Sequence, residues 1–598
     1  MGSKFFKGVF FLILAGIFII IYALPLGLLS LSNSPDENAN FTFSKLFAET
    51  SDLRIFAPEN ILAQEQISPR SVTSHNFFLV PGSFIGLPLL YGLIGKISIS
   101  LIPFLTPFFA IFGVLAFFGI IRRVFSIKIA FFSSLLLLIH PAWWYWSSRV
   151  MMHNVLFISL LLIVIYFLIK ITQSPPATDS ADKKLFSTYY LVFTHFIAGI
   201  FIGLAILVRT SEIIWVAPLV IALIIYKIAQ MPLVADYADK SNPPSSPLIL
   251  RGGLYHFFAF LLPIIFIVVL LFSWNTLLYG SPLSFGYQPP GVVEQTSQVL
   301  TVANTLPSSP PYLRDNPPSS PPYLRGGAGG LFNYLLPFGF HPRAIWKNFF
   351  DYFVKIFWWW TLPLAYGLFH IAYKWRKGVL DKQQKLYVFL CLYVFVFLAA
   401  IYGSGRFIDY PDPKVISIGN SYVRYWLPLY ILSLPFIAFA LCALVDLGGK
   451  IRGFRRKIFS IFYLLFAICY FIWNAYYVLV AAPVSLLKVR TTLKTYQPKV
   501  ERVLALTKPD SLVIASWYDK LFWPKRKVVF SLNSQEFLKV LPFIIKKYPV
   551  YYYSWSKEKD APYLKEDILH KIGLTVVGEI PISGNEGLLE IKEMPKVM

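Results

Sequence analysis

Charged residues are scarce in this sequence. Asp, Glu, Lys and Arg make up 14% of its 598 residues, whereas a soluble domain carries about 25%. Hydrophobic residues make up 56%, the mean hydropathy is +0.61, and many uncharged runs reach the ~20 residues that a helix needs to span a bilayer. The composition excludes an ordinary soluble protein and predicts an all-α polytopic membrane protein.

Cysteine is also rare. The three cysteines, Cys391, Cys442 and Cys469, lie far apart in apolar segments. This spacing excludes both a disulfide framework and a cysteine metal site.

Several catalytic motifs are missing. The sequence has no P-loop, HExxH, CxxC or GxSxG motif, so nothing indicates a nucleotide site in the cytoplasm. An enzyme acting at the outer face would then need an activated donor carried by the membrane. Acidic residues are also missing from the centres of the apolar runs, which argues against an ion-coupled transporter.

Acidic residues are outnumbered by basic ones, 30 to 54, giving a net charge of +24. In a soluble protein this excess would suggest nucleic acid, but here the tendency of cytoplasmic loops to be basic accounts for it. Basic clusters at 122–128, 374–385 and 450–457 fall on the side fixed by Lys4 and Lys7. We therefore expect about eleven transmembrane helices, a cytoplasmic N-terminus, a first span that is retained, and no nucleic-acid partner.

The predicted spans lie in a domain of residues 1–484, which includes a first outer loop at about 32–78. Residues 485–598 have ordinary charge content and no spanning run. Within them, residues 511–516, 527–531, 550–554 and 574–578 are predicted to be strands, and 534–547 and 563–572 helices. This alternation indicates a small α/β domain with a partly parallel sheet, on the outer face of the membrane.

A proline-rich motif is repeated in two loops. Residues 242–253 read NPPSSPLILRGG, and related copies occur within 308–330. Such segments can bind partners, but the predicted topology puts the copies on opposite sides of the membrane. We favour the interpretation that they are low-complexity inserts tolerated in loops.

Two adjacent carboxylates, Asp36 and Glu37, follow the first apolar run and lie on the predicted outer face. A carboxylate in a cavity beside the membrane can act as a general base on an acceptor hydroxyl. The alternative is a solvated helix end. The aromatic residues of 143–146 are predicted to form a belt at the level of the lipid headgroups.

Three arginines, Arg149, Arg209 and Arg424, are predicted to lie at the same outer face as Asp36. Guanidinium groups are suited to a lipid-linked phosphate; the alternatives are a snorkelling Arg149 and a structural pair between Arg209 and Glu212. Other residues in this region are accessory candidates: His153 (alternatively a core histidine), His75, Glu212 and Tyr425.

Short motifs in a fixed order give the chain a family resemblance. They are Asp36-Glu37 in the first outer loop, Ser148-Arg149-x-x-Met152-His153, Gly203 to Arg209, Trp274-Asn275-x-x-x-Tyr279-Gly280-Ser281-Pro282 with Gly286-Tyr287, and Arg424-Tyr425-x-x-Pro428. In this order they resemble the GT-C glycosyltransferases, in particular bacterial relatives of the dolichyl-phosphate-mannose protein mannosyltransferases and of the aminoarabinose lipid A transferase.

The resemblance implies transfer of a sugar from a polyprenyl- or dolichyl-phosphate donor, with inversion, on the outer face. Asp36 would be the base, with Glu37 as the other candidate, and Arg149, Arg209 and Arg424 would contact the donor phosphate. Many relatives have a second acidic residue near the fourth span, but residues 139–157 contain none, and His153 occupies the region. This departure puts a metal-assisted mechanism in doubt, so no cofactor is assigned and a divalent metal stays an open alternative.

The leading hypothesis is a polyprenyl-phosphate-sugar-dependent glycosyltransferase of the plasma membrane (the inner membrane of a bacterium). Its partners would be the lipid-linked donor, the bilayer and a protein, lipid or glycan acceptor. One alternative is a non-enzymatic transporter or flippase of a lipid-linked saccharide, which would use the same arginines. Another is a membrane scaffold whose outer tail binds partners.

Overall fold

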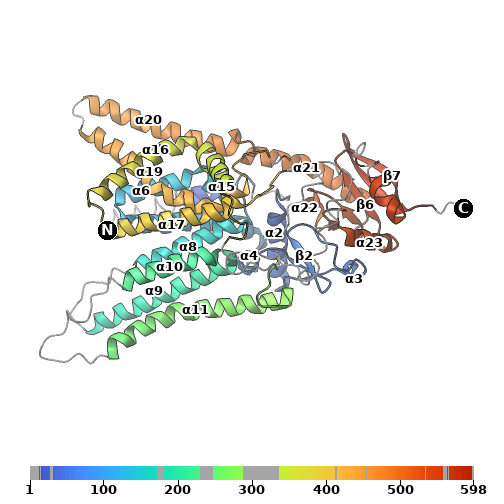
Figure 1. The fold of residues 1–598 in the computed structure, drawn as a ribbon, viewed down its shortest axis with the longest axis horizontal. Helices are drawn as coiled ribbons and strands as arrows, with labels where there is room; N and C mark the ends of the chain where they lie inside the picture. The colour runs from blue at the N-terminus through green and yellow to red at the C-terminus, as the bar shows by residue number, and fades with distance from the viewer. Residues whose placement is uncertain are drawn as a thin grey trace.

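The computed structural model is elongated, with long helices along most of its length and a sheet-containing part at one end (Figure 1). The structure describes residues 13, 15–26, 31–170, 181–228, 247–286, 336–410, 412, 414–450, 454–532, 534–556, 560, 562 and 564–595. The predicted proline-rich insert at 308–330 lies outside these residues.

Among the described residues between 99 and 506, the regular elements are all helices. In order they are η1 (Ile99–Leu101), α5 (Ile102–Val124), α6 (Ile127–Ile139), α7 (Pro141–Ser148), α8 (His153–Lys170), α9 (Ala181–Val208), η2 (Thr210–Glu212), α10 (Ile213–Ile228), α11 (Pro247–Tyr279), α15 (Pro342–Phe349), η5 (Phe350–Lys355), α16 (Trp358–Arg376), α17 (Lys382–Ser404), α18 (Ser421–Tyr425), α19 (Leu427–Lys450), α20 (Phe454–Tyr476), η6 (Tyr477–Ala481) and α21 (Leu486–Leu506).

Several of these helices fit a membrane. Within the described residues, five are long and apolar enough to cross a bilayer, or six if the bent pair α6–α7 forms one span. Shorter apolar helices lie at Gly86–Gly95, His153–Ile169, Thr210–Tyr226 and Leu427–Ala443. The chain is therefore mostly helical and suited to a membrane, while the number of eleven spans stays a prediction.

The aromatic run of α7 does not form the predicted belt facing lipid. Trp143, Trp144, Tyr145 and Trp146 are each at most 3% exposed. Helix α7 is bent by 51° from α6, and the bend turns these side chains into the apolar core that also contains Trp426. The prediction was wrong because sequence alone does not show this bend.

The proline-rich copy at 242–253 is only partly described. Residues from Pro247 onward belong to α11 rather than to a loop. Proline is tolerated in the first turn of a helix because its missing N–H has no helical partner there, so the copy merges into the apolar run that follows it.

The first outer loop contains regular structure of its own. It holds α2 (Pro35–Thr50), β1 (Ile55–Phe56), α3 (Glu59–Leu62) and β2 (Val72–His75). Strand β3 (Phe78–Pro81) begins at the end of the loop, and α4 (Gly86–Gly95) follows it. The three strands form an antiparallel sheet in the order β1-β3-β2.

The tail contains the predicted, partly parallel sheet. Its elements are β4 (Leu512–Ile514), α22 (Asp519–Phe522), β5 (Lys527–Val529), α23 (Gln535–Ile544), β6 (Val550–Ser554), η7 (Leu564–Leu569), η8 (His570–Ile572), β7 (Leu574–Ser583) and β8 (Glu586–Glu593). The strand order is β5-β4-β6-β8-β7, in which β4 pairs in parallel with β5 and β6. Strand β8, which the sequence patterns did not indicate, pairs antiparallel with β6 and β7.

The tail and the first outer loop share an apolar core. Phe43 of α2 and Val80 of β3 belong to the same buried cluster as Phe522, Trp523 and Tyr553 of the tail. Figure 1 accordingly shows α2 and β2 beside α22. The predicted boundary at residue 485 stays a prediction, and this cluster contains residues from both sides of it.

Candidate active site

The two candidate carboxylates lie in the first turn of α2. Ser34 is the N-cap residue: its side chain accepts a hydrogen bond from the backbone N–H of Asp36 (3.1 Å). Glu37 completes a capping box by accepting from the backbone N–H of Ser34 (3.1 Å). Pro35 occupies a first-turn position that suits proline. The pair therefore starts a new helix and is not the frayed end of the preceding span.

Asp36 is held by two partners from distant parts of the chain. Its Oδ1 accepts from the Ser71 hydroxyl (2.5 Å), and its Oδ2 accepts from Arg424 Nη1 (3.2 Å). The Asp36 side chain remains 27% exposed. Burial acts to raise the pKa of this carboxyl, but the charge of Arg424 and the Ser71 hydrogen bond outweigh it and leave the pKa below its usual value. Asp36 is thus ionised at neutral pH and accessible.

Glu37 has a different partner and is more enclosed than Asp36. Its carboxylate forms an ion pair with Arg149, and the two side chains are 8% and 3% exposed. Arg149 Nη1 also donates to the Tyr145 hydroxyl (3.1 Å). Because Glu37 also caps α2, this buried pair fixes the helix start to the segment between α7 and α8.

Aromatic rings connect the three predicted arginines. The ring of Trp146 lies against the guanidinium groups of Arg149 (5.6 Å) and Arg424 (5.8 Å). The ring of Tyr425 lies against those of Arg424 (5.0 Å) and Arg209 (5.2 Å). We call these five residues the arginine array. The predicted convergence of the arginines is therefore present in the structure, with cation–π contacts in which like charges are separated by rings.

Arg209 belongs to a buried network. Its Nε and Nη2 donate to one carboxylate oxygen of Glu212 (3.0 and 2.6 Å). Glu212 also accepts from the Tyr402 hydroxyl (2.5 Å) and from the Trp215 indole. Glu212 therefore holds Arg209 at the edge of the arginine array, as expected of a structural pair.

His153 lies beside α2 and is engaged in structural contacts. Its Nε2 is 2.9 Å from the Phe84 carbonyl oxygen, and its Nδ1 is 3.5 Å from the Asn40 side-chain nitrogen. The Asn40 amide also donates to the Met151 carbonyl (2.8 Å). These contacts match the alternative of a buried core histidine that helps to hold the 149–153 segment against α2.

His75 is not brought to the carboxylates. It lies at the opposite end of β2 from Ser71, where its ring contacts Asn76 (3.2 Å). His75 follows Ser71 by four positions in the sequence, which corresponds to roughly 13 Å in an extended chain. Its sequence position in the outer loop was therefore misleading.

Ser71 is a site residue that sequence reasoning missed. It lies in a loop without periodicity, and its only signal is the turn-forming Ser-Pro-Arg-Ser stretch of 68–71. Its φ angle of 62° is in the left-handed region, as is that of Met151 (71°). Strained backbone at non-glycine residues is concentrated at functional sites, and both residues lie beside α2.

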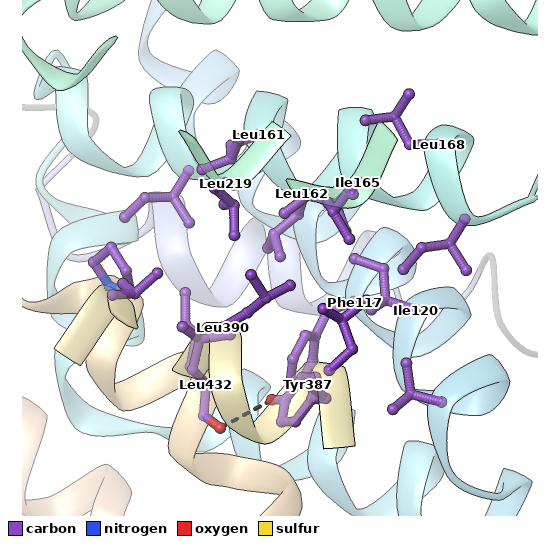
Figure 2. A pocket seen from close by; sticks show the side chains of 18 of the residues that line it. Phe117, Ile120, Leu161, Leu162, Ile165, Leu168, Leu219, Tyr387, Leu390 and Leu432 are labelled. Carbon is purple, nitrogen blue, oxygen red and sulfur yellow. Dashed lines mark hydrogen bonds between the residues drawn. The ribbon is translucent and has the colours of Figure 1, made fainter. Parts of the chain in front are cut away.

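An apolar cavity of about 120 Å³ lies among the helices next to this site. It is lined by residues of α5, α8, α10, α17 and α19, and Figure 2 shows leucine and isoleucine side chains pointing into it. Tyr387, at its edge, donates to the Leu432 carbonyl (2.9 Å). Trp215, which donates to Glu212, also lines the cavity, so the cavity meets the network that holds Arg209.

The described residues contain no cluster of three or more His, Cys, Asp or Glu side chains that could hold a metal ion. The ionisable groups of the site are instead arranged as carboxylate–guanidinium pairs, Asp36 with Arg424 and Glu37 with Arg149.

Comparison with known proteins gives matches among solved structures only. No family model matches the chain, and no curated protein gives a significant match. One similar structure is ArnT from Cupriavidus metallidurans bound to undecaprenyl phosphate, at 11% identity and a TM-score of 0.48, covering 98% of each chain.

Structures of the Archaeoglobus fulgidus oligosaccharyltransferase are also similar. The form tethered with an acceptor peptide matches at 13% identity and a TM-score of 0.47, covering 94% of this chain and 70% of that chain. AglB from the same organism, in complex with an inhibitory peptide and a dolichol-phosphate, matches at 13% identity and a TM-score of 0.46. Both kinds of protein are GT-C glycosyltransferases, the kind that the sequence motifs resemble. Each of these TM-scores lies below 0.5.

Proposed function

We propose that this protein is a membrane glycosyltransferase. It transfers a sugar from a polyprenyl-phosphate-linked donor to a protein, lipid or glycan acceptor on the extracytoplasmic face, with Asp36 as the general base. The observation that carries the proposal is the accessible, ionised Asp36 carboxylate paired with Arg424, which contacts both rings of the arginine array.

Asp36 has the geometry and charge that a base requires. One of its oxygens is fixed by Ser71 and the other by Arg424, while 27% of the side chain stays open. The acceptor hydroxyl oxygen attacks the anomeric carbon and passes its proton to the Asp36 carboxylate. The bond from this carbon to the phosphate oxygen breaks, its electron pair leaves with the polyprenyl phosphate, and a single displacement inverts the configuration.

Arg424 is the arginine best placed to contact the donor phosphate. Its side chain is 15% exposed and contacts Asp36. A donor phosphate bound to Arg424 would therefore lie beside the base that takes the proton from the acceptor. A guanidinium offers forked donors to a phosphate. Arg149 and Arg209 are engaged by Glu37 and Glu212. They add positive potential and hold the array in place.

The apolar cavity supports a lipid-linked donor. Its lining is almost entirely aliphatic and aromatic, and Trp215 connects it to the network of Arg209 and Glu212. A polyprenyl phosphate would place its phosphate at the arginine array and part of its chain between the helices around the cavity (Figure 2). Burial of apolar chain would add to affinity at roughly 25 cal/mol per Å².

The predicted topology completes the proposal. About eleven spans, with the N-terminus in the cytoplasm, would put α2, the arginine array and the tail on the extracytoplasmic side of the plasma or bacterial inner membrane. Helix α2 contacts both Arg424 and the tail residue Trp523. These contacts support a position of α2, the arginine array and the tail on the same side of the membrane.

The experiment is to incubate membranes containing the protein with labelled undecaprenyl-phosphate mannose or undecaprenyl-phosphate aminoarabinose. We expect label to enter an acceptor together with release of undecaprenyl phosphate in equal amount. Movement of intact donor between leaflets without such release would instead identify a transporter. The labelled acceptor is then identified by mass spectrometry.

A further inference from the structure

Two consecutive tail residues contact the two chain segments that orient Asp36. Asp519 contacts the segment that carries Ser71, and Lys520 contacts the turn before α2. They form the start of α22, which lies beside α2 in Figure 1. More than 480 residues separate Lys520 from its contact at α2, so only the fold brings the two together.

Asp519 holds the segment that carries Ser71. Its carboxylate accepts from the Arg70 backbone N–H (2.9 Å) and from Arg70 Nη2 (2.6 Å), and its own side chain is fully buried. The Arg70 guanidinium also lies between the rings of Trp517 (4.8 Å) and Phe530 (4.5 Å). Because Arg70 directly precedes Ser71, this clamp fixes the hydroxyl that donates to Asp36.

Lys520 holds the turn that leads into α2. Its Nζ donates to the Asn33 carbonyl oxygen at 2.5 Å. The Asn33 backbone N–H in turn donates to Glu37 Oε2 (3.0 Å). Asn33 directly precedes Ser34, whose hydroxyl accepts from the Asp36 backbone N–H. A second contact, from the Asn38 amide to the Trp523 carbonyl (2.9 Å), anchors the other side of the same helical turn.

Backbone strain is found on both sides of this contact. Ser71 in the outer loop has φ 62° and Trp517 in the tail has φ 63°. Left-handed backbone at non-glycine residues is unfavourable, and it persists where surrounding contacts determine the conformation. The Arg70–Asp519 pair with its flanking rings supplies such contacts for both residues.

We propose that Asp519 and Lys520 are positioning residues for the transfer reaction: the tail holds the Ser71 segment and the α2 entrance, and so sets the direction of the Asp36 carboxylate. This inference rests on the proposed role of Asp36 as the base. It assigns the tail a part in catalysis through two side chains.

Charges around Lys520 make this role dependent on pH. Burial lowers the pKa of Lys520 to about 8, and the charges of Arg70 and Arg149 act in the same direction, while Asp519 and Glu37 oppose them. As pH rises through about 8, the ammonium group loses its charge and its hydrogen bond to Asn33 weakens. Transfer should therefore decline above pH 8, because the turn that orients Asp36 loosens.

The test compares Lys520→Met, Lys520→Arg and the control Lys525→Met in the full-length protein in detergent. Lys525 lies in the same part of the tail and is exposed. Amide hydrogen exchange is measured in residues 33–38 and in β4. We expect Lys520→Met to speed exchange in 33–38 about tenfold, as for loss of a charged hydrogen bond, while β4 stays protected. Lys520→Arg should restore most of the protection, and Lys525→Met should match the wild type.

Transfer of labelled mannose from undecaprenyl-phosphate mannose provides the second readout. Lys520→Met should lower kcat about tenfold with little change in KM for the donor. Lys520→Arg should keep its rate above pH 8, where the wild type declines. If Lys520→Met also speeds amide exchange in β4, the tail of this variant is no longer intact. The pH–rate profiles of the wild type and Lys520→Arg then test the inference.

The inference would be overturned if residues 33–38 of the Lys520→Met variant exchanged their amide hydrogens at the wild-type rate. Identical pH–rate profiles for the wild type and Lys520→Arg would also overturn it. Absence of transfer by the wild type would contradict the proposed function instead. The exchange measurement needs no substrate, so the two failures can be told apart.

Discussion

The two sides of the first turn of α2 differ in what surrounds their carboxylates. On one side, Asp36 meets Ser71 and Arg424 and is 27% exposed. On the other, Glu37 pairs with Arg149, and the two side chains are 8% and 3% exposed. Consecutive residues of a helix point about 100° apart, so one acidic pair in the sequence supplies an open carboxylate and a buried one.

This difference in exposure suits the two carboxylates to different roles, Asp36 to catalysis and Glu37 to holding the structure. A base must reach its substrate, so the open, ionised Asp36 is suited to proton transfer. A buried ion pair costs more to break than an exposed one, so Glu37 and Arg149 are suited to fixing the helix. The comparison predicts that mutations on the two sides affect different observables.

The largest effect is expected for Asp36→Asn. Removing the base while keeping the shape of the side chain should lower the transfer rate about 10²–10⁴-fold, with little change in thermal stability. Sugar transfer and thermal unfolding are measured on the same preparation. Asp52→Asn is the control, because Asp52 pairs with Arg54 at a more exposed position of the outer loop.

Glu37→Gln should act mainly on stability. It leaves the Arg149 guanidinium buried without its carboxylate, which costs roughly 3–5 kcal/mol. Chemical denaturation in detergent measures the loss. Combining it with Arg149→Met should recover part of this stability, since no buried charge is then left alone. Additive losses in the double variant would contradict the pairing.

Arg424→Gln should weaken donor binding. Loss of one charged hydrogen-bonding group costs about 1.5–3 kcal/mol, so KM for undecaprenyl-phosphate mannose should rise roughly 10- to 150-fold. Steady-state kinetics at saturating acceptor measure this change. An unchanged KM together with a lower kcat would move Arg424 from the donor site to the support of Asp36.

The same variant should shift the acid limb of the pH–rate profile. The charge of Arg424 lowers the pKa of Asp36, so its removal raises that pKa. The base then becomes protonated at a higher pH as acid is added, and activity is lost earlier than in the wild type. Profiles that coincide for wild type and Arg424→Gln would argue against Asp36 as the titrating group.

The smallest effect is expected at the distant edge of the array. Tyr402→Phe removes one of the hydrogen bonds to Glu212 and should lower stability by about 1 kcal/mol. Arg209 keeps two donors to Glu212, so donor KM should change less than in Arg424→Gln. A larger kinetic effect would show that this network takes part in binding.

Parts of this molecule were predictable because they depend on local patterns. Apolar runs indicated the long helices, and alternating segments indicated β4, β5, β6 and β7. The helix that begins at Pro35 was not predicted, although Ser34-Pro35-Asp36-Glu37 has the pattern of a helix start. The convergence of Arg149, Arg209 and Arg424 followed from their common predicted side of the membrane.

Other parts depend on contacts between distant segments. Neither Ser71 nor Lys520 belongs to a motif, and each reaches α2 only because the outer loop and the tail share a core. The bend that buries Trp146, and the directions in which Asp36 and Glu37 point, follow from packing in three dimensions. Sequence position likewise could not separate His75, which lies away from the site, from His153, which lies beside α2.

The central claim is that Asp36 takes the proton from the acceptor during sugar transfer. The most direct measurement is a single-turnover reaction of wild type and Asp36→Asn with labelled undecaprenyl-phosphate mannose, using equal amounts of folded protein and membrane acceptors. We predict that the wild type releases undecaprenyl phosphate in step with an inverted glycoside product, and that Asp36→Asn binds the donor but transfers at least about 100-fold more slowly. Transfer by Asp36→Asn at the wild-type rate would contradict the claim.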